Sequence, residues 1–308
     1  MNIREAHEKF ATDEQCLEYI GKMRWPDGVI RCPECGEKNI KRVERSAASK
    51  NRRKWFYLCL EKTCHNQFTP TSGTIFHDTH LPLIVWFQAI ALVLNAKKGI
   101  SALQLQRDLG IGGYKTAWYL NHRIREVMSE GDIRKLGGTV EIDESYIGGK
   151  QRGQQGKLKN KDVVIGMRQR SGPLRLVQAK DNRGETVLQI LYDNVDKNVE
   201  KIMTDESPIY NFELTAYHRA KHQQIKHKSK VYVKGEVHTN TIESAFSLFK
   251  RGIIGSFHQV SIKHLQRYLN EFCYRFNRRE DAEAFTETVR RLAGFKPIPF
   301  ARLTAEQA

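Results

Sequence analysis

The chain has 308 residues, enough for two or three domains, and its 40% of hydrophobic residues can build packed cores. Its 51 Lys and Arg outnumber 35 Asp and Glu, and the net charge of +16 indicates an anionic partner, of which nucleic acid is the leading candidate. The charged N-terminus excludes a signal peptide, and the most apolar stretch, residues 81–94, is too short to span a bilayer, so we expect a soluble intracellular protein.

The N-terminal region has the pattern of a helical segment followed by a small β module. Residues 1–30 place Phe10, Leu17 and Ile20 among charged residues, and a turn follows at residues 25–28. A strand-like run precedes each of two cysteine pairs, at Val29-Ile30 and at residues 54–58. The polar and basic residues 44–54 are interpreted as a loop between two strands.

Four clustered cysteines predict a structural zinc site. Cys32 and Cys35 form a C-x2-C pair, and Cys59 and Cys64 form a C-x4-C pair after 23 intervening residues. Four thiolates close a tetrahedral Zn²⁺ site and leave no open position for water, so this zinc would fold a ribbon rather than catalyse a reaction. His65 is an alternative to Cys64 as the fourth ligand.

Helical patterns continue to about residue 130. Pro82 begins a helix that reaches about Ala96, Ser101 begins a second with Gln104 at the capping-box position, and a third follows the Gly-rich turn at residues 109–113. We interpret residues 81–131 as a helix-turn-helix-like DNA-binding region, with a plain helical hairpin as the alternative. The third helix is expected to present five residues away from its apolar face: Lys115, Trp118, Tyr119, His122 and Arg123. Of these, Lys115 and Arg123 are the candidate DNA contacts.

After a linker at residues 131–138 the pattern changes to a mixed α/β domain. The predicted strands are residues 139–143, 163–167, 174–179 and 199–205. A helix at residues 186–192 separates the third and fourth strands, and two helices follow at residues 241–251 and 262–279. The organisation is therefore a multidomain chain: residues 1–80 as helix and zinc ribbon, 81–131 as the helix-turn-helix-like region, 138–279 as the α/β domain, and 280–308 as a C-terminal tail.

Three carboxylates in the α/β domain form a candidate catalytic set. Asp143 and Asp205 each end a predicted strand, and neighbouring strands would bring these like charges together. Mg²⁺ or Mn²⁺ between them would relieve the repulsion and supply two-metal phosphoryl-transfer chemistry. Glu243 follows on a helix, with 37 residues between it and Asp205, and it shares one helix face with Asn240 and Lys250.

Basic residues near this set are candidate phosphate contacts. Lys250 and Arg251 end the helix that carries Glu243. The Gly-rich segment 145–161 is basic without any acid, and it is interpreted either as a loop that orders on DNA or as a surface hairpin; its candidate DNA contacts are Lys150, Arg152, Lys157 and Lys159.

The motifs together resemble the bacterial insertion-sequence DDE transposases that carry an N-terminal zinc ribbon. The matching stretches are CPECG with CLEKTC, FTPTSGTIF, LPLIVWFQAI, VEIDESYIGG, IMTDESPIY, and HTNTIESAFSLFKRG with the residues after it. The resemblance implies a ribonuclease H-like fold for residues 139–279. It also implies that Asp143, Asp205 and Glu243 hold the catalytic metal, with Lys250 as the basic residue that follows.

Two details of the carboxylate set go beyond these three residues. Asn240 is a secondary candidate for the third position, because some family members are described with Asn there. Glu141, Glu144 and Glu206 flank the aspartates and are expected to point elsewhere, since neighbouring strand positions alternate faces.

The predicted function is metal-dependent 3′-end cleavage and strand transfer of an insertion sequence, after binding of its terminal inverted repeats. The partners are double-stranded DNA of the element ends and of the target, and a homodimer or higher oligomer is expected on DNA, in the cytoplasm with the bacterial nucleoid. One alternative is a non-catalytic regulator that only binds DNA. The other is a metal-dependent nuclease or resolvase on a similar fold.

Overall fold

The computed structural model describes residues 1–51, 53–129, 134–148, 162–205, 207, 210, 222–224 and 239–305. They form two compact units: residues 1–96, 100–127 and 281–305 in the first, and residues 97–99 and 128–280 in the second. Within the described ranges, no helix is long and apolar enough to cross a membrane. The predicted DNA contacts at residues 150, 152, 157 and 159 lie outside the described residues.

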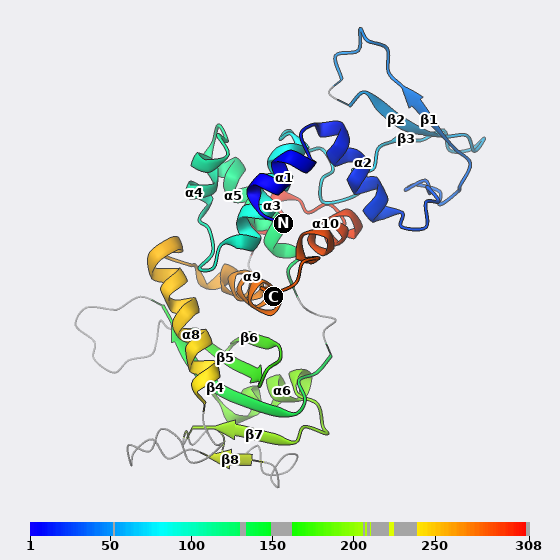
Figure 1. Cartoon of the computed structure of the whole chain (residues 1–308). Coiled ribbons are helices and arrows are strands. Elements are labelled where there is room, and N and C mark those ends of the chain that lie inside the picture. Colours follow the sequence, from blue (N-terminus) through cyan, green and yellow to red (C-terminus); the bar gives the residue numbers. More distant parts are fainter. Residues whose placement is uncertain are drawn as a thin grey trace. The chain divides into compact units, whose positions relative to one another are not determined.

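The first unit combines a set of helices with a small sheet (Figure 1). Its helices are α1 (Ile3–Lys9), α2 (Asp13–Arg24), α3 (Leu83–Asn95), α4 (Ala102–Asp108), α5 (Tyr114–Glu126), α10 (Ala284–Gly294) and α11 (Phe300–Thr304). Capping boxes begin α1 and α2, each closed by hydrogen bonds in both directions between the N-cap residue and the third helical residue. Ser101 caps α4 through a hydrogen bond from the Gln104 amide, as the sequence predicts.

Helix α10 corrects the prediction of a C-terminal tail. Its Phe285 joins an aromatic cluster with Phe10, before α2, and Phe87 of α3, with ring centroids 5.9 and 5.7 Å from Phe285. The side chain of Phe285 is buried. The packing of this segment has no local signal in the sequence, because its apolar residues find their partners only far away along the chain.

The β module of the first unit is a three-stranded antiparallel sheet of β1 (Ile40–Glu44), β2 (Trp55–Cys59) and β3 (Gln67–Phe68). Strand β2 and the loop before it agree with the sequence prediction. The predicted strand at Val29-Ile30 is wrong, because Ile30 packs against the ribbon core with no partner strand while the first strand comes after the first cysteine pair.

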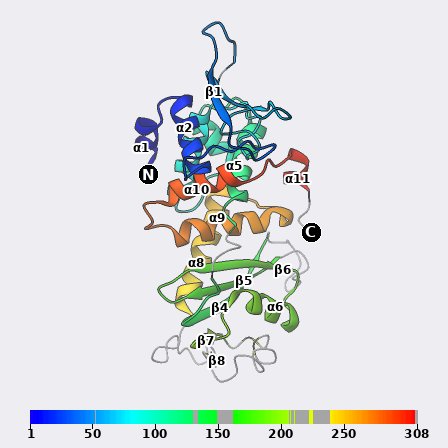
Figure 2. The same ribbon diagram turned by 90° about the vertical axis from the view of Figure 1, so that its right-hand side faces the viewer.

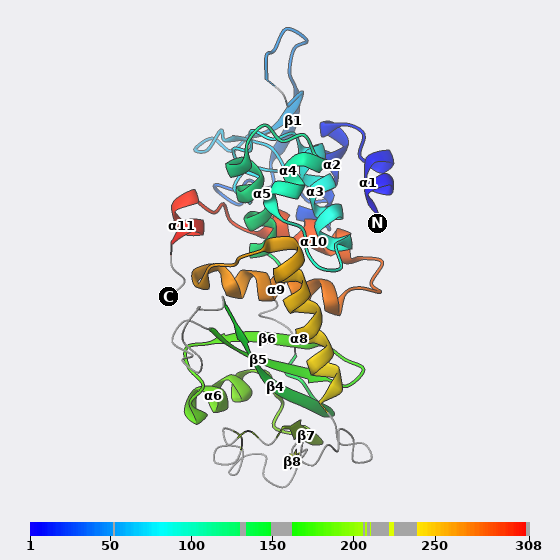
Figure 3. The same cartoon turned by 90° about the vertical axis from the view of Figure 1, so that its left-hand side faces the viewer.

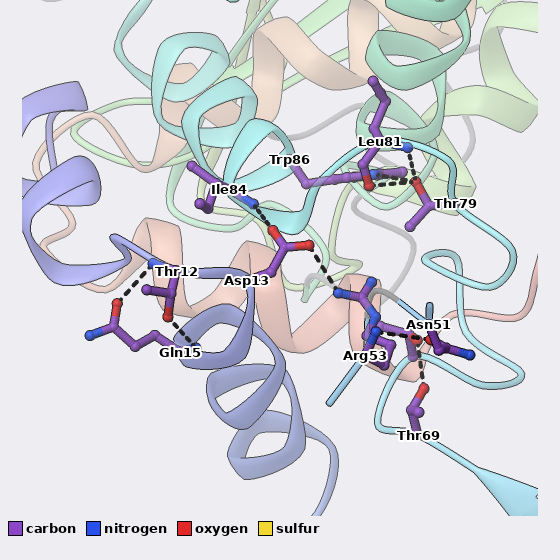
Figure 4. Close-up of polar contacts among 11 residues, drawn as sticks. Thr12, Asp13, Gln15, Asn51, Arg53, Thr69, Thr79, Leu81, Ile84 and Trp86 are labelled. Atoms are coloured by element: carbon purple, nitrogen blue, oxygen red, sulfur yellow. Dashed lines mark hydrogen bonds and ion pairs between the residues drawn. The ribbon is translucent and has the colours of Figure 1, made fainter. Parts of the chain in front are cut away.

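A polar bridge joins this sheet to the helices (Figure 4). The Asp13 carboxylate accepts a hydrogen bond from the Ile84 amide (3.2 Å) and pairs with Arg53 (3.1 Å), which lies at the end of the loop between β1 and β2. Helix α3 has no side-chain cap at Pro82, its N-cap residue. Asp13 therefore supplies the missing acceptor from another helix.

Helix α5 is more buried than its periodicity predicts. His122 is fully buried and Arg123 is 6% exposed, with its guanidinium 5.3 Å from the Trp86 ring and 4.9 Å from the Tyr119 ring. The prediction that both lie off the apolar face is wrong, because α3 and the C-terminal segment cover a second side of α5. Tyr119, for example, donates to the Ile298 carbonyl (2.7 Å).

The second unit is built on a mixed five-stranded sheet of order β6-β5-β4-β7-β8. Its strands are β4 (Thr139–Ile147), β5 (Asp162–Gln169), β6 (Leu174–Ala179), β7 (Lys201–Thr204) and β8 (His222–Gln224), and its helices are α6 (Gly184–Asn194), α8 (Asn240–Gly252) and α9 (Leu265–Asn277). A π-helical turn (Ile253–Phe257) and a 3-10 turn (Ile262–His264) join α8 to α9. Strands β4, β5 and β6 are antiparallel, whereas β7 is parallel to both β4 and β8.

Helices cover both faces of this sheet (Figures 2 and 3). Helix α6 packs on the face that carries Val140 and Ile142 of β4, while α8 and α9 pack on the face that carries Val164 of β5. The strand and helix order agrees with the sequence prediction, apart from β8, which is too short and polar to predict. The arrangement is consistent with the expected ribonuclease H-like domain.

Candidate metal centres

The four predicted cysteines converge on one point of the ribbon. The Sγ atoms of Cys32 and Cys64 are 3.7 Å apart, as are those of Cys35 and Cys59, and all four lie within 4.8 Å of one another. A tetrahedral zinc with bonds of about 2.3 Å places its sulfurs about 3.8 Å apart. The cysteines therefore fit a structural Zn²⁺.

The chain turns around each cysteine pair in a way that aims both thiols inward. After the first pair, Gly36 takes a φ of 81°, which only glycine adopts without strain, and its amide donates to the Cys32 carbonyl (2.9 Å). At the second pair the Cys64 amide donates to the Glu61 carbonyl (3.0 Å). Cys64 belongs to the cluster of four, and its neighbour His65 does not.

The thiol pKa values show why a cation belongs there. Although burial opposes it, backbone amides of Cys35 and Glu34 lower the pKa of Cys32 to about 6. Despite the Asn66 amide, burial and the three other cysteines raise the pKa of Cys64 to about 12. Four thiolates this close cannot all be charged unless a metal ion neutralises them.

In the second unit, β4 and β7 bring two predicted aspartates together. The parallel register pairs Glu141 with Met203, so that Asp143 and Asp205, each two residues further on, come side by side. Asp205 directly follows β7, as predicted. Asp143 does not end its strand as predicted but lies in the middle of β4, because the following residues Ser145–Ile147 still pair with β5.

Glu144 is a third member of this carboxylate group, which corrects the expectation that it points elsewhere. One oxygen from each of Asp143, Glu144 and Asp205 lies within 4.8 Å of the other two. The Tyr210 hydroxyl donates to Glu144 (2.6 Å) from the face opposite Asp143. Strand β7 ends at Thr204, so carboxylates from both faces of β4 can meet beyond the last residue of β7.

Electrostatics at this group favour a cation. Burial, together with the nearby charges of Glu144, Asp205 and Glu243, raises the pKa of Asp143 to about 7. A carboxyl group that resists ionisation beside other carboxylates is a site where a divalent cation gains affinity by removing the repulsion.

Helix α8 places the other predicted catalytic residues on one exposed face. Asn240, Glu243, Lys250 and Arg251 are all exposed. The Thr239 hydroxyl donates to the Glu243 carboxylate (2.7 Å), and this carboxylate is near enough to raise the pKa of Asp143. Among the described residues, Glu243 is not one of the three whose oxygens lie within 4.8 Å of one another.

The structure adds a residue that sequence reasoning set aside. Glu141 is completely buried and accepts hydrogen bonds from Thr241 and Ile242 at the start of α8. Side chains two positions apart in a strand share a face, so Glu141 lies on the same face as Asp143. The expectation that Glu141 points away from the Asp143 face is therefore wrong, because alternation separates adjacent positions and not positions two residues apart.

Two family models match the chain. One, described as an ISXO2-like transposase domain, matches residues 135–277, and the other, described as a transposase zinc-ribbon domain, matches residues 11–67. A relative from Halobacterium salinarum, described as an uncharacterized protein in transposable element ISH50, is 26% identical over 285 residues, which are 85% of this chain and 90% of the relative. The ribbon match spans all four clustered cysteines, and the transposase match spans the sheet and α8. The chain therefore belongs to the insertion-sequence transposases in which a zinc ribbon precedes a DDE transposase domain.

Proposed function

We propose that the protein cleaves the 3′ ends of its insertion sequence and joins them to target DNA, using divalent metal held by Asp143, Asp205 and Glu243. The observation that carries the proposal is the group of close carboxylates beside the start of α8, on a sheet matched by a transposase domain model. Glu144, the third member of that group, is a further oxygen donor, and Asn240 is the secondary candidate for the third ligand.

The chain's residues hold and orient the reacting groups. When bound, Mg²⁺ or Mn²⁺ activates the attacking oxygen and stabilises the leaving oxygen of each phosphodiester. Asp143 and Asp205 supply oxygens from neighbouring strands, and Glu243 approaches from α8. Lys250, two turns further along the exposed face of α8, contacts a DNA phosphate together with Arg251.

The first unit supplies DNA recognition in this proposal. The zinc ribbon, with α4 and α5 as a helix-turn-helix-like pair, reads the terminal inverted repeats, and the exposed Lys115 contacts DNA. Arg123 is not proposed as a contact, because it is buried. Residues 150–159 add basic contacts to the DNA backbone. Two element ends have to be joined in one complex, so a homodimer or higher oligomer forms on DNA.

The test uses purified zinc-loaded protein, Mg²⁺, a labelled duplex carrying the element's own end, and a plasmid target. We expect 3′-end cleavage and joined products for the wild type and neither for Asp143→Ala, while both bind the duplex equally. Arg183→Ala, on the face of the sheet covered by α6, is the matched control and is expected to behave as the wild type.

Two alternative functions have distinct outcomes in the same assay. Tight binding of the duplex without cleavage under Mg²⁺ or Mn²⁺, unchanged in Asp143→Ala, would identify a DNA-binding regulator. Cleavage without any joined product would identify a nuclease or resolvase on the same fold.

A further inference from the structure

Glu141 makes an unusual set of contacts for a buried carboxylate. Its side chain is completely buried in β4. One oxygen accepts from the Arg170 guanidinium (2.8 Å), and the other accepts from the Thr241 amide (2.9 Å), the Thr241 hydroxyl (2.6 Å) and the Ile242 amide (3.2 Å). Each oxygen is therefore satisfied, which a buried charge requires.

These contacts cap a helix from a different element. Helix α8 has no side-chain cap of its own at Thr239. The first amides of a helix have no partner within the helix and carry partial positive charge, so the Glu141 carboxylate both satisfies and neutralises the start of α8. The cap joins the strand that carries Asp143 to the helix that carries Glu243.

A residue of the neighbouring strand β5 also binds Thr241 at the start of α8. Arg168 of β5 pairs in register with Glu141 and donates to the Thr241 carbonyl (2.8 Å). Thr241 is thus held by its amide and hydroxyl through Glu141 and by its carbonyl through Arg168. Gly166, opposite Asp143 in the register, lets the helix approach closely, because a Cβ there would lie 2.6 Å from the Phe246 ring.

The spacing ties this cap to the catalytic set. Glu141 lies two residues before Asp143 on the same face of β4, about 6.7 Å along the strand. Thr241 lies two residues before Glu243 on α8. A shift of the start of α8 relative to β4 therefore changes the distance from Glu243 to Asp143 directly.

We propose that Glu141 is a positioning residue: by capping α8 from β4, it sets the reach of Glu243 to the metal site formed with Asp143 and Asp205. The proposal rests on the function proposed above, since it takes these residues as the metal ligands. An apolar residue could fill the same space, but it would leave the start of α8 without a fixed direction.

The test measures two quantities in the wild type and in variants. The first is Mn²⁺ affinity, obtained by electron paramagnetic resonance on zinc-loaded protein, and the second is the Mg²⁺ dependence of end cleavage. Glu141→Gln keeps the shape and removes the charge. We expect it to weaken Mn²⁺ binding and to raise the half-saturating Mg²⁺ concentration by about tenfold or more, the usual effect of losing a residue that orients metal ligands. DNA affinity is expected to stay within about twofold, because DNA binding depends on other contacts.

Substitutions at Thr241, the partly buried helix end of the cap, keep the test decisive if Glu141→Gln fails to fold. Thr241→Val removes the hydroxyl that donates a hydrogen bond to Glu141. We expect a threefold to fivefold loss of Mn²⁺ affinity, which corresponds to about 0.6–1 kcal/mol, the contribution of one hydrogen bond. Thr241→Ser keeps the hydroxyl and is expected to match the wild type. Thr186→Val is the matched control: Thr186 lies in the first turn of α6 and hydrogen-bonds Asp181, on the opposite face of the sheet.

The outcomes separate this proposal from the function on which it rests. If Glu141→Gln and Thr241→Val lower the melting temperature but leave Mn²⁺ affinity and Mg²⁺ dependence unchanged, Glu141 only stabilises the fold and the proposal is overturned. Equal defects in Thr241→Ser and Thr241→Val would overturn it as well. If the wild type binds Mn²⁺ in a Glu141-dependent way but never cleaves DNA, the positioning role stands and the proposed function fails.

Discussion

At the scale of single residues, the surroundings of Asp143 oppose the charge on its carboxylate. Asp143 lies in the middle of β4, close to the Glu144 and Asp205 carboxylates, and burial is the largest reason why its pKa rises to about 7. The folded protein therefore holds a proton on this carboxyl that the unfolded chain, with an ordinary value of 3.8, releases. Between these two values stability falls as pH rises.

The prediction concerns zinc-loaded protein without Mg²⁺ or Mn²⁺. Asp143→Asn removes the charge, so we expect its stability advantage over the wild type to grow from pH 5.5 to about 7 and then to level off, at up to about 4 kcal/mol. Denaturant unfolding across this range measures the difference. Added Mg²⁺ at pH 8 should stabilise the wild type and narrow the gap. A stability difference between Asp143→Asn and the wild type that is constant with pH would contradict the raised pKa of Asp143.

Gly166 carries a second prediction at this scale. A Cβ there would meet both Phe246 and Ile242 of α8 at less than 3 Å, and the site is buried. We expect Gly166→Ala to destabilise the protein by about 1–3 kcal/mol through overpacking. Gly137→Ala is the control in the same unit, since its Cβ would meet no atom within 4 Å. Equal unfolding midpoints for the two variants would show that α8 packs less closely than described.

At the scale of elements, the ribbon sheet is too small to fold on apolar contacts alone. Its core holds few buried residues, and two of them, Cys32 and Cys59, belong to the thiol cluster. The strands are at most five residues long. We therefore expect metal binding to supply much of the folding free energy of this element.

Zinc content tests this dependence. We expect one zinc per chain in the wild type, and loss of that zinc together with loss of ribbon structure in Cys35→Ser, measured by metal analysis and by nuclear magnetic resonance. Cys273→Ala removes a buried thiol in α9 that lies outside the cluster, and it should retain the full zinc content. Zinc retained by Cys35→Ser would argue against a closed four-cysteine site.

At the scale of the whole molecule, we expect the net charge of +16 to govern encounters with the proposed DNA partner. Lysines and arginines that neutralise phosphates release counterions, so the logarithm of the DNA affinity falls linearly with the logarithm of salt concentration. The exposed end of α8 is one place where this charge is accessible, through Lys250 and Arg251.

We expect Lys250→Ala and Arg251→Ala each to reduce the slope of that salt dependence by about one, with similar losses for specific and unrelated duplexes. The slope is measured by fluorescence anisotropy at salt concentrations from about 50 to about 200 mM. Arg183→Ala, on the α6 side, should leave it unchanged. An unaltered slope in both α8 variants would place the DNA away from this face of α8.

The sequence alone determined those features that depend on residues close together along the chain. The C-x2-C and C-x4-C spacings set the ligands of the ribbon, and capping residues such as Ser101 and Thr12 set where helices begin. The resemblance of whole motifs pointed to the family before any contact was known. These features depend on bonds and turns between residues a few positions apart, and such neighbours can be found in a single sequence.

Only the tertiary structure decided which faces are covered and which carboxylates meet. Arg123 and His122 look like solvent-facing residues in the periodicity of α5, but both are buried, and Arg123 packs against Trp86 of α3. Glu144 joins Asp143 because β7 ends early, whereas Glu141 caps the start of α8 and is not part of the carboxylate group. Burial and charge neutralisation depend on partners a hundred residues away, so no local pattern records them.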